Sequence, residues 1–400
     1  MPSRRDLLRG AAGAGAAGLA ATAGCLGVVD GSLAGATPGT DADADWPTPR
    51  YDARRTAYSP DAVAPRDGAT VSWRVDVDHP GPPVIADGTV VVSSYPTGVV
   101  AFDAASGERR WRYGPGEYPA FGAPTVADGV VYAPSTDGMA ALELASGTEL
   151  WRGPPGTPEA TPIVTDEGRT LFGGGADGHL YQLDPATGDV TWETDLFGRI
   201  TTLAAKIDVF AGTRGGEVYA FDGRFDPTEG WRRRFPGPIE GVTAHDNGPT
   251  VTAFGAPTTI LTDSGGTGEV FRTVDGDRAA SRPVLVGSWV VAAGYDAIST
   301  TRSFDGHRGW TVNGRFDRCA PVAAGDTLYV GDPDGVHAFA LSGGVGVGGY
   351  RVGAKRWAKQ IGAVRGLAVG AGSLVATVAR DDGYEVVALD PVDGGAPNGD

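Results

Sequence analysis

The chain has 400 residues, a formal net charge of −16, and 49 Asp and Glu residues against 33 Lys and Arg residues. This acidic balance excludes a nucleic-acid-binding protein that relies on a basic surface. Because the chain has only two Cys residues, Cys25 and Cys319, it is also not a domain held together by a disulfide framework. The 64 Gly residues and the scarcity of helix signals favour an all-β chain.

The first 25 residues have the features of an export signal. Ser3-Arg4-Arg5-Asp6-Leu7 resembles a twin-arginine motif, and the Ala- and Gly-rich stretch that follows is too short for a permanent membrane helix. Thr22-Ala23-Gly24-Cys25 resembles a lipobox, although Thr22 stands where Leu is usual. We expect Arg4 and Arg5 to direct export and Cys25 to carry lipid. The alternative is an ordinary signal peptide with an incidental Cys, and a secreted protein.

The residues after the signal lack strand patterning up to about residue 45. Residues 26–45 are rich in Gly, Ala, Thr and Asp, which is typical of a flexible tether. Asp41, Asp43 and Asp45 lack the spacing and the Gly of a calcium loop. The expected folded domain covers residues 46–392, and residues 393–400 are expected to be a disordered tail.

From residue 69 onward, one pattern returns roughly every forty residues. Short apolar runs are separated by Asp-Gly pairs, a hairpin signal because Gly accepts a positive φ. Each repeat then carries the phrase Asp-x-x-(Ser/Thr)-Gly followed by a strand with an aromatic residue, as in Asp103 to Gly107 before Trp111. A fixed period of this length indicates stacked supersecondary units, and four antiparallel strands per unit make the blade of a β-propeller.

The aromatic residues give the number of blades, because each is expected to pack between two neighbouring blades. These anchors are Trp73, Trp111, Trp151, Trp192, Trp231, Phe271, Trp310 and Trp357. They predict eight blades. Seven remain an alternative, because the repeat from Ile239 to Thr273 has Phe271 in place of Trp. The strand of Trp73 has no blade before it, so we expect it to close the last blade and remove an exposed sheet edge.

The phrase Ala101-Phe102-Asp103-Ala104-Ala105-Ser106-Gly107 and the lead-in from Trp46 to Tyr58 resemble the pyrroloquinoline-quinone (PQQ)-like propeller family, over residues 46–392. This family includes quinoprotein dehydrogenases, which hold PQQ and a calcium ion. It also includes BamB, the lipoprotein scaffold of bacterial outer-membrane barrel assembly. The resemblance implies the propeller fold, and it implies either a scaffold or an enzyme, because fold does not fix activity.

The charge composition is also informative about the host. The chain has three Lys residues, and Asp outnumbers Glu, which together with the Ala- and Gly-rich leader is similar to the proteins of haloarchaea. Such a surface stays soluble in high salt, where screening reduces self-repulsion. The alternative is a moderately acidic exported protein of a high-GC bacterium. In a host without an outer membrane, the assembly role of BamB does not transfer.

The sequence favours a scaffold over an enzyme. It has neither the adjacent Cys pair nor the Cys-x-x-Cys-His motif of many quinoprotein dehydrogenases, and it has no Gly-x-Ser-x-Gly motif. Its five His residues are scattered, and the segment Asp332-Pro333-Asp334-Gly335 is predicted to be a hairpin turn rather than a metal site. We therefore expect no catalytic, cofactor-binding or metal site. Arg232 to Arg234 and Lys355-Arg356 are the basic clusters after the leader, and solvent exposure at strand edges is their simplest interpretation.

The resulting hypothesis is a monomeric, non-catalytic propeller that binds an unidentified protein partner. It would be lipid-anchored at the outer face of the cytoplasmic membrane. The alternative is a dehydrogenase that depends on PQQ and calcium.

Overall fold

The computed structural model describes a defined part of the chain: residue 33 and residues 36–114, 122–135, 137–153, 158–165, 170–222, 227–245, 248–262, 267–274, 282–316, 319–347, 350–352 and 354–392. Arg4, Arg5, Cys25 and the predicted tail 393–400 lie outside the described residues. Within the described part, no helix is long and apolar enough to cross a membrane.

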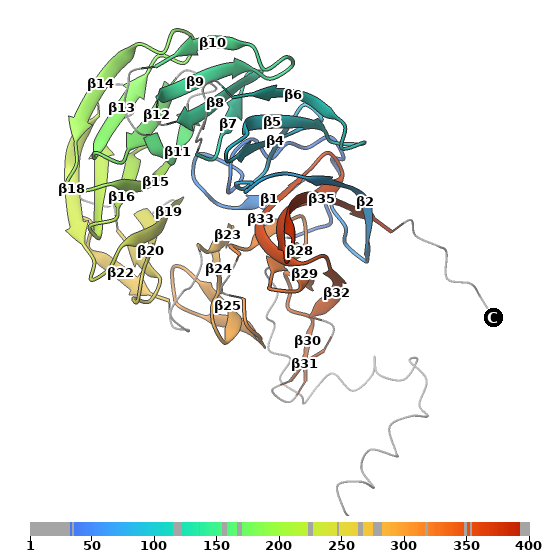
Figure 1. The fold of residues 1–400 in the computed structure, drawn as a ribbon. Coiled ribbons are helices and arrows are strands. Elements are labelled where there is room, and N and C mark those ends of the chain that lie inside the picture. The colour runs from blue at the N-terminus through green and yellow to red at the C-terminus, as the bar shows by residue number, and fades with distance from the viewer. Residues whose placement is uncertain are drawn as a thin grey trace, which may run out of the picture.

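The described chain folds into a ring of eight antiparallel blades, which confirms the predicted β-propeller (Figure 1). The repeat with Phe271 forms a complete blade, so the seven-bladed alternative is excluded. Inner strands such as β4 (Thr89–Ser94) are buried along their whole length, because both of their faces are covered by neighbouring blades. The apolar core therefore lies between the blades rather than on one side of a single sheet.

Each of the first six blades takes four consecutive strands, called A to D from the axis outward. Blade 1 consists of β3 (Val84–Ala86), β4, β5 (Gly98–Asp103) and β6 (Arg109–Tyr113). Blade 2 consists of β7 (Thr125–Ala127), β8 (Val130–Ser135), β9 (Gly138–Glu143) and β10 (Glu149–Arg152). Blade 3 consists of β11 (Pro158–Thr165), β12 (Thr170–Gly175), β13 (His179–Leu183) and β14 (Val190–Asp195). Blade 4 consists of β15 (Ile200–Ala205), β16 (Val209–Thr213), β17 (Glu217–Asp222) and β18 (Thr228–Arg234). Blade 5 consists of β19 (Ile239–His245), β20 (Gly248–Ala253), β21 (Thr259–Leu261) and β22 (Val270–Thr273). Blade 6 consists of β23 (Val284–Val286), β24 (Trp289–Ala293), β25 (Ala297–Arg302) and β26 (Arg308–Asn313).

The last two blades also use strands from the N-terminal part of the chain. Blade 7 consists of β27 (Val322–Ala324), β28 (Thr327–Gly331), β29 (Gly335–Ala340) and β32 (Lys355–Gln360), with β1 (Tyr58–Ser59) added in parallel to β27 and the hairpin β30 (Val345–Val347) and β31 (Tyr350–Val352) inserted before β32. Blade 8 consists of β33 (Ala363–Gly370), β34 (Ser373–Arg380), β35 (Gly383–Pro391) and β2 (Ala69–Asp76).

Strand β2 closes the ring as predicted. It pairs antiparallel with β35, and the register runs from Ala69 opposite Pro391 to Asp76 opposite Glu385. In Figure 1 these two strands, from opposite ends of the chain, lie side by side. The pairing covers the edge that β35 would otherwise expose.

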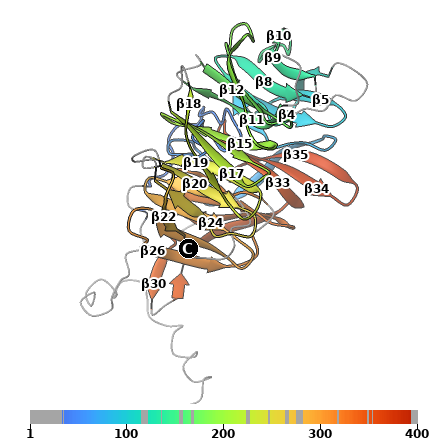
Figure 2. The same cartoon turned by 90° about the vertical axis from the view of Figure 1, so that its left-hand side faces the viewer.

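Because successive strands are antiparallel, the turns alternate between the two faces of the ring. The A–B and C–D turns lie on one face, here called the AB face. The B–C turns and the links from strand D to the next strand A lie on the other, here called the DA face. Figure 2 shows the ring turned by 90°, with blades 4 and 5 toward the viewer.

The Asp-x-x-(Ser/Thr)-Gly phrase forms the C–D turn. In blade 1 the Asp103 carboxylate accepts hydrogen bonds from the Ser106 amide (2.9 Å) and from the Arg110 guanidinium (2.8 Å). These donors lower the pKa of Asp103 to about 2, with Arg110 as the main cause. The chain reverses at Gly107, where φ is +72°. The phrase is thus a self-contained turn that needs both Asp and Gly.

The same turn receives the Trp of the preceding blade. The Trp73 indole donates a hydrogen bond to the Ala104 carbonyl (2.8 Å), and its ring lies so close to Gly107 that a Cβ there would be 2.7 Å from it. The equivalent indole bonds, with nitrogen–oxygen distances, are Trp111 to Leu144 (2.7 Å), Trp151 to Pro185 (2.9 Å), Trp310 to Leu341 (2.7 Å) and Trp357 to Pro65 (2.9 Å). Trp192 packs edge-on against Phe221, and the Trp231 ring lies against Gly268.

The anchor expected at Phe271 is wrong by one residue. Arg272, not Phe271, lies opposite the central residue of strand C, Ile260, at the register position that Trp takes in other blades. The Arg272 guanidinium lies against Gly306 of the next blade, while the Phe271 side chain is 50% exposed. A long side chain that ends in hydrogen-bond donors can take the place of the Trp indole. The sequence pattern of aromatic residues could not reveal this replacement.

Two glycines of blade 2 separate backbone strain from blade packing. Gly147 (φ +70°) would place a Cβ 2.6 Å from the Trp111 ring, whereas Gly129 (φ +74°) has no atom within 4 Å of that position. We expect Gly129→Ala to cost about 1 kcal/mol, the usual cost of a left-handed non-Gly residue. Gly147→Ala should cost about 2 kcal/mol more through overpacking. Urea unfolding of both variants measures the difference, and equal losses would disprove the inter-blade contact.

Candidate functional site

The axis of the ring is occupied by the chain's own N-terminal segment, residues 41–59, here called the plug. Its backbone makes a circuit that meets seven blades in turn through hydrogen bonds to or near their inner strands: Ala44 with Ala371 (blade 8), Trp46 with Ile85 (blade 1), Pro47 with Val126 (blade 2), Ala53 with Ala205 (blade 4), Arg54 with Ala244 (blade 5), Thr56 with Leu285 (blade 6) and Ala57 with Ala323 (blade 7). Trp46, the start of the lead-in, is fully buried. The plug therefore fills the AB end of the central channel.

Part of the predicted tether belongs to this plug. Asp41 bridges to Ala62, and the Asp45 carboxylate accepts the Asp87 amide (3.0 Å). The Gly39 backbone lies directly against Ala62 and against Gly325, in the A–B turn of blade 7. Residues 36–45 are therefore packed on the AB face, and the expected boundary at residue 45 is corrected to about residue 36. The sequence missed this because the contacts are made by the backbone, which leaves no apolar periodicity.

Arg55 ties the plug to blades 3 and 4. Its guanidinium is buried and donates to backbone carbonyls and one hydroxyl: Leu203 (2.9 Å), Thr161 (2.8 Å), Pro162 (3.1 Å), Pro49 (3.0 Å) and Thr48 (2.6 Å). Bulges in strands β11 and β15 interrupt the ladder near these carbonyls. Arg55 thus satisfies inner-strand acceptors that the neighbouring strands leave unpaired.

Arg50 plays the corresponding role on the opposite side of the axis. It donates to the carbonyls of Pro321 (2.8 Å) and Pro283, which precede the inner strands of blades 7 and 6. Burial, reinforced by the nearby Arg282, lowers the pKa of Arg50 and of Arg55 to about 9. Both guanidinia stay protonated at neutral pH, and the axis therefore has a cationic lining.

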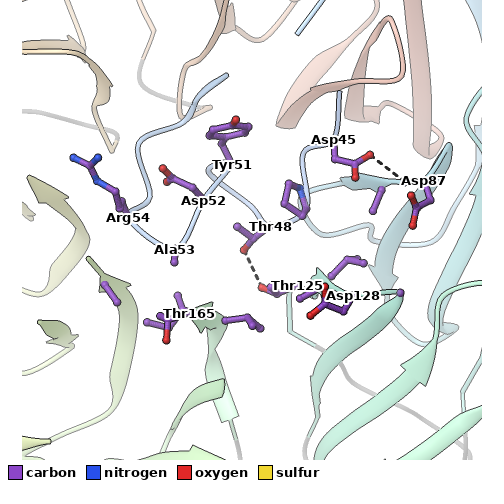
Figure 3. Close-up of a pocket in the computed structure, with 18 of the residues that line it drawn as sticks. Asp45, Thr48, Tyr51, Asp52, Ala53, Arg54, Asp87, Thr125, Asp128 and Thr165 are labelled. Carbon is purple, nitrogen blue, oxygen red and sulfur yellow. Dashed lines mark hydrogen bonds between the residues drawn. The ribbon is translucent and has the colours of Figure 1, made fainter. Parts of the chain in front are cut away.

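A cleft of about 660 Å³ opens on the AB face between the plug and the ends of the A strands of blades 1 to 4 (Figure 3). Asp45, Asp52, Asp87 and Asp128 line it, together with Arg54 and Lys206. Burial raises the pKa of Asp45 and of Asp52. Asp52 accepts the Thr56 amide (2.8 Å) and hydroxyl (3.0 Å), and the hydroxyls of Thr48 and Thr125 bond to each other (2.8 Å). The carboxylates of Asp45 and Asp52 thus help to fix the plug.

Other residues weighed in the sequence have structural surroundings. Asp332 accepts the amides of Asp334 (2.8 Å) and Gly335 (2.7 Å), which confirms the predicted hairpin turn. Burial raises the pKa of the Cys319 thiol to about 12, so it stays protonated. The Arg356 side chain is only 12% exposed and pairs with Asp326 (2.7 Å). The expected solvent exposure of Arg356 is therefore wrong. Among the described side chains, no three of His, Cys, Asp or Glu are grouped to hold a metal ion.

The plug gives a direct test of its structural role. Replacing Arg55 by Met keeps the length of the side chain but leaves several buried carbonyls without donors, so the free energy of unfolding should fall by about 3 kcal/mol or more. Arg109→Met, at an exposed position of β6, should change it by less than about 0.5 kcal/mol. Chemical denaturation of both variants measures this. A tolerated Arg55→Met would mean that the plug does not hold the ring.

Solved structures similar to this one include a BamB protein and dehydrogenases. BamB from Moraxella catarrhalis has a TM-score of 0.60 and 19% identity, covering 81% of this chain and 100% of that chain. A europium-containing methanol dehydrogenase has a TM-score of 0.65 and 12% identity, covering 88% and 98%. The quinohemoprotein alcohol dehydrogenase from Comamonas testosteroni has a TM-score of 0.62 and 14% identity, covering 89% and 82%. At these identities the likeness is one of fold.

Comparison with curated proteins gives no match. The family model described as outer membrane protein assembly factor BamB matches residues 61–199 and 135–347, which together cover more than half of the chain. The chain therefore belongs to this BamB family of PQQ-like β-propellers.

Proposed function

We propose that this protein is an exported, non-catalytic scaffold, held by lipid on Cys25 at the outer face of the cytoplasmic membrane, that binds a protein partner through the DA face. The observation that carries the proposal is where the chain enters the ring. Residues 37–39 lie on the AB face beside the A–B turn of blade 7. The membrane anchor and the DA face would then lie on opposite sides of the molecule.

The length of the remaining chain supports this orientation. Ten residues lie between Cys25 and Ala36, and the fully extended chain from Cys25 to Ala36 spans at most roughly 40 Å. A lipid on Cys25 would therefore keep the AB face near the membrane. Loops on a rigid scaffold are common recognition sites, and the DA face would be the one presented to solvent.

The residues at the axis do not suit the alternative function, a PQQ- and calcium-dependent dehydrogenase. Calcium needs six to eight oxygen ligands, often carboxylates. The side chains that converge on the axis are the guanidinia of Arg50 and Arg55, close enough to Arg282 for mutual repulsion, and they would also repel a divalent cation. The cleft carboxylates of Asp45 and Asp52 already accept backbone amides. The described residues at the axis therefore do not fit a site for a quinone and calcium.

Substitution of the lipidation residue tests the anchor. Cys25→Ser should release the protein from the membrane into the medium, because no acyl chain would then hold it. Cys319→Ser is the matched control, since it removes the other thiol, and it should remain with the membrane. Fractionation followed by immunoblotting measures both variants. Membrane retention of Cys25→Ser equal to that of the unaltered chain would disprove lipid anchoring.

An oxidation assay tests the absence of catalysis. The purified chain is titrated with PQQ and Ca²⁺ and supplied with alcohols or sugars and an artificial electron acceptor dye. We expect no dye reduction above the rate without protein. Substrate-dependent reduction that requires both additions would overturn the scaffold proposal in favour of the dehydrogenase.

A further inference from the structure

Two phenylalanines of the DA face are exposed to solvent to an unusual degree. The Phe197 side chain, in the link from blade 3 to blade 4, is 67% exposed, and Phe254, in the B–C turn of blade 5, is 66% exposed. Of the other exposed phenylalanines, Phe271 lies on the outer strand of blade 5, and Phe304 lies in the C–D turn of blade 6, on the AB face. An apolar side chain in such a position usually serves binding only when it belongs to a continuous patch.

The two phenylalanines are connected through the B–C turn of blade 4. A Cβ at Gly215, in this turn, would lie 3.8 Å from the Phe197 ring. The next residue, Gly216, accepts the Phe235 amide (2.7 Å), and the Gly237 backbone that follows packs directly against Phe254. Phe197 and Phe254 thus lie on either side of one glycine-rich turn.

Arginines accompany the phenylalanines. The Arg214 amide donates to the Arg199 carbonyl (2.8 Å), so these exposed residues lie beside the same turn. The carboxylates near this turn include Glu217, which is buried and accepts the Tyr219 hydroxyl, and the exposed Glu240. They also include Asp195, which pairs with His179, and the exposed Asp177, whose neighbour Gly178 contacts the link that carries Phe197. We call Phe197, Arg199, Arg214 and Phe254 the Phe–Arg patch. It stands out on a chain of net charge −16.

We propose that the Phe–Arg patch docks an acidic segment of a partner protein. Aromatic residues and Arg are enriched at the energetic centres of protein interfaces, and Arg beside apolar rings favours a carboxylate-rich ligand. On a protein of net charge −16, an Arg-containing patch also gives an acidic partner a local attraction that most of the surface lacks. This inference rests on the proposed scaffold function and specifies the chemistry of the partner.

Photo-crosslinking tests the patch on the full-length protein. p-Benzoylphenylalanine replaces Phe197, Phe254 or, as a matched control at the outer edge of blade 5, Phe271. Each protein is incubated with membranes of the native host and irradiated, and the crosslinked partner peptides are identified by mass spectrometry. We expect adducts from positions 197 and 254 with peptides rich in Asp and Glu, and at least about tenfold fewer from position 271.

Charge reversal then tests the acidic chemistry. Arg199→Glu with Arg214→Glu, in the protein labelled at position 197, should reduce adduct yield at least about tenfold, whereas Arg109→Glu on the outer strand of blade 1 should not. Adducts that survive the reversal, or that contain a second copy of this chain, would overturn the proposal. Adducts from position 271 alone would reject the patch but leave the scaffold function intact. No adducts at any position would count against both.

Discussion

The ring depends on one repeated contact, in which a side chain of an outer strand docks on the C–D turn of the next blade. In four blades an indole N–H donates to a carbonyl of that turn. The flat ring fits because the turn ends in Gly, which has no Cβ to obstruct it, as at Gly107 and Gly188. One residue pair thus sets the spacing between blades, the burial of the aromatic ring and the geometry of the turn. Because these three properties depend on the same residues, the repeat can be recognised in the sequence.

The N-terminal segment adds a second constraint, which acts across the ring instead of around it. Strand β2 completes blade 8, and the Trp357 indole uses the Pro65 carbonyl in place of a C–D turn. Between these elements and the free end of the chain, the plug hydrogen-bonds to one inner strand after another. Its buried arginines use carbonyl acceptors, so they bind several blades at once without needing a carboxylate from each. Closure at the edge and closure at the axis therefore both come from residues 36–76.

The sequence was informative where side-chain chemistry repeats and uninformative where the backbone makes the contact. Eight blades, their boundaries and the closing strand followed from Trp, Asp and Gly spacing. Arg272 was not predicted as an anchor because a guanidinium can take the place of an indole without sharing its apolar character. The plug was not predicted because residues 41–59 are bound largely through backbone amides and carbonyls, which any residue supplies. Phe197 and Phe254 could not be distinguished from core residues in a chain with 13 Phe, because exposure is a property of the assembled ring.

The axis also explains why function is better sought on a face than in the channel. In this chain the channel's AB end is packed with the plug, and the two guanidinia that reach into it are committed to inner-strand carbonyls. Altering these groups to suit a ligand would remove support from the inner strands of blades 3, 4, 6 and 7. The turns of the DA face do not support several inner strands at once, because each closes one hairpin or links two neighbouring blades. Substitutions there should disturb the ring less than substitutions at the axis, which is compatible with the proposed scaffold function.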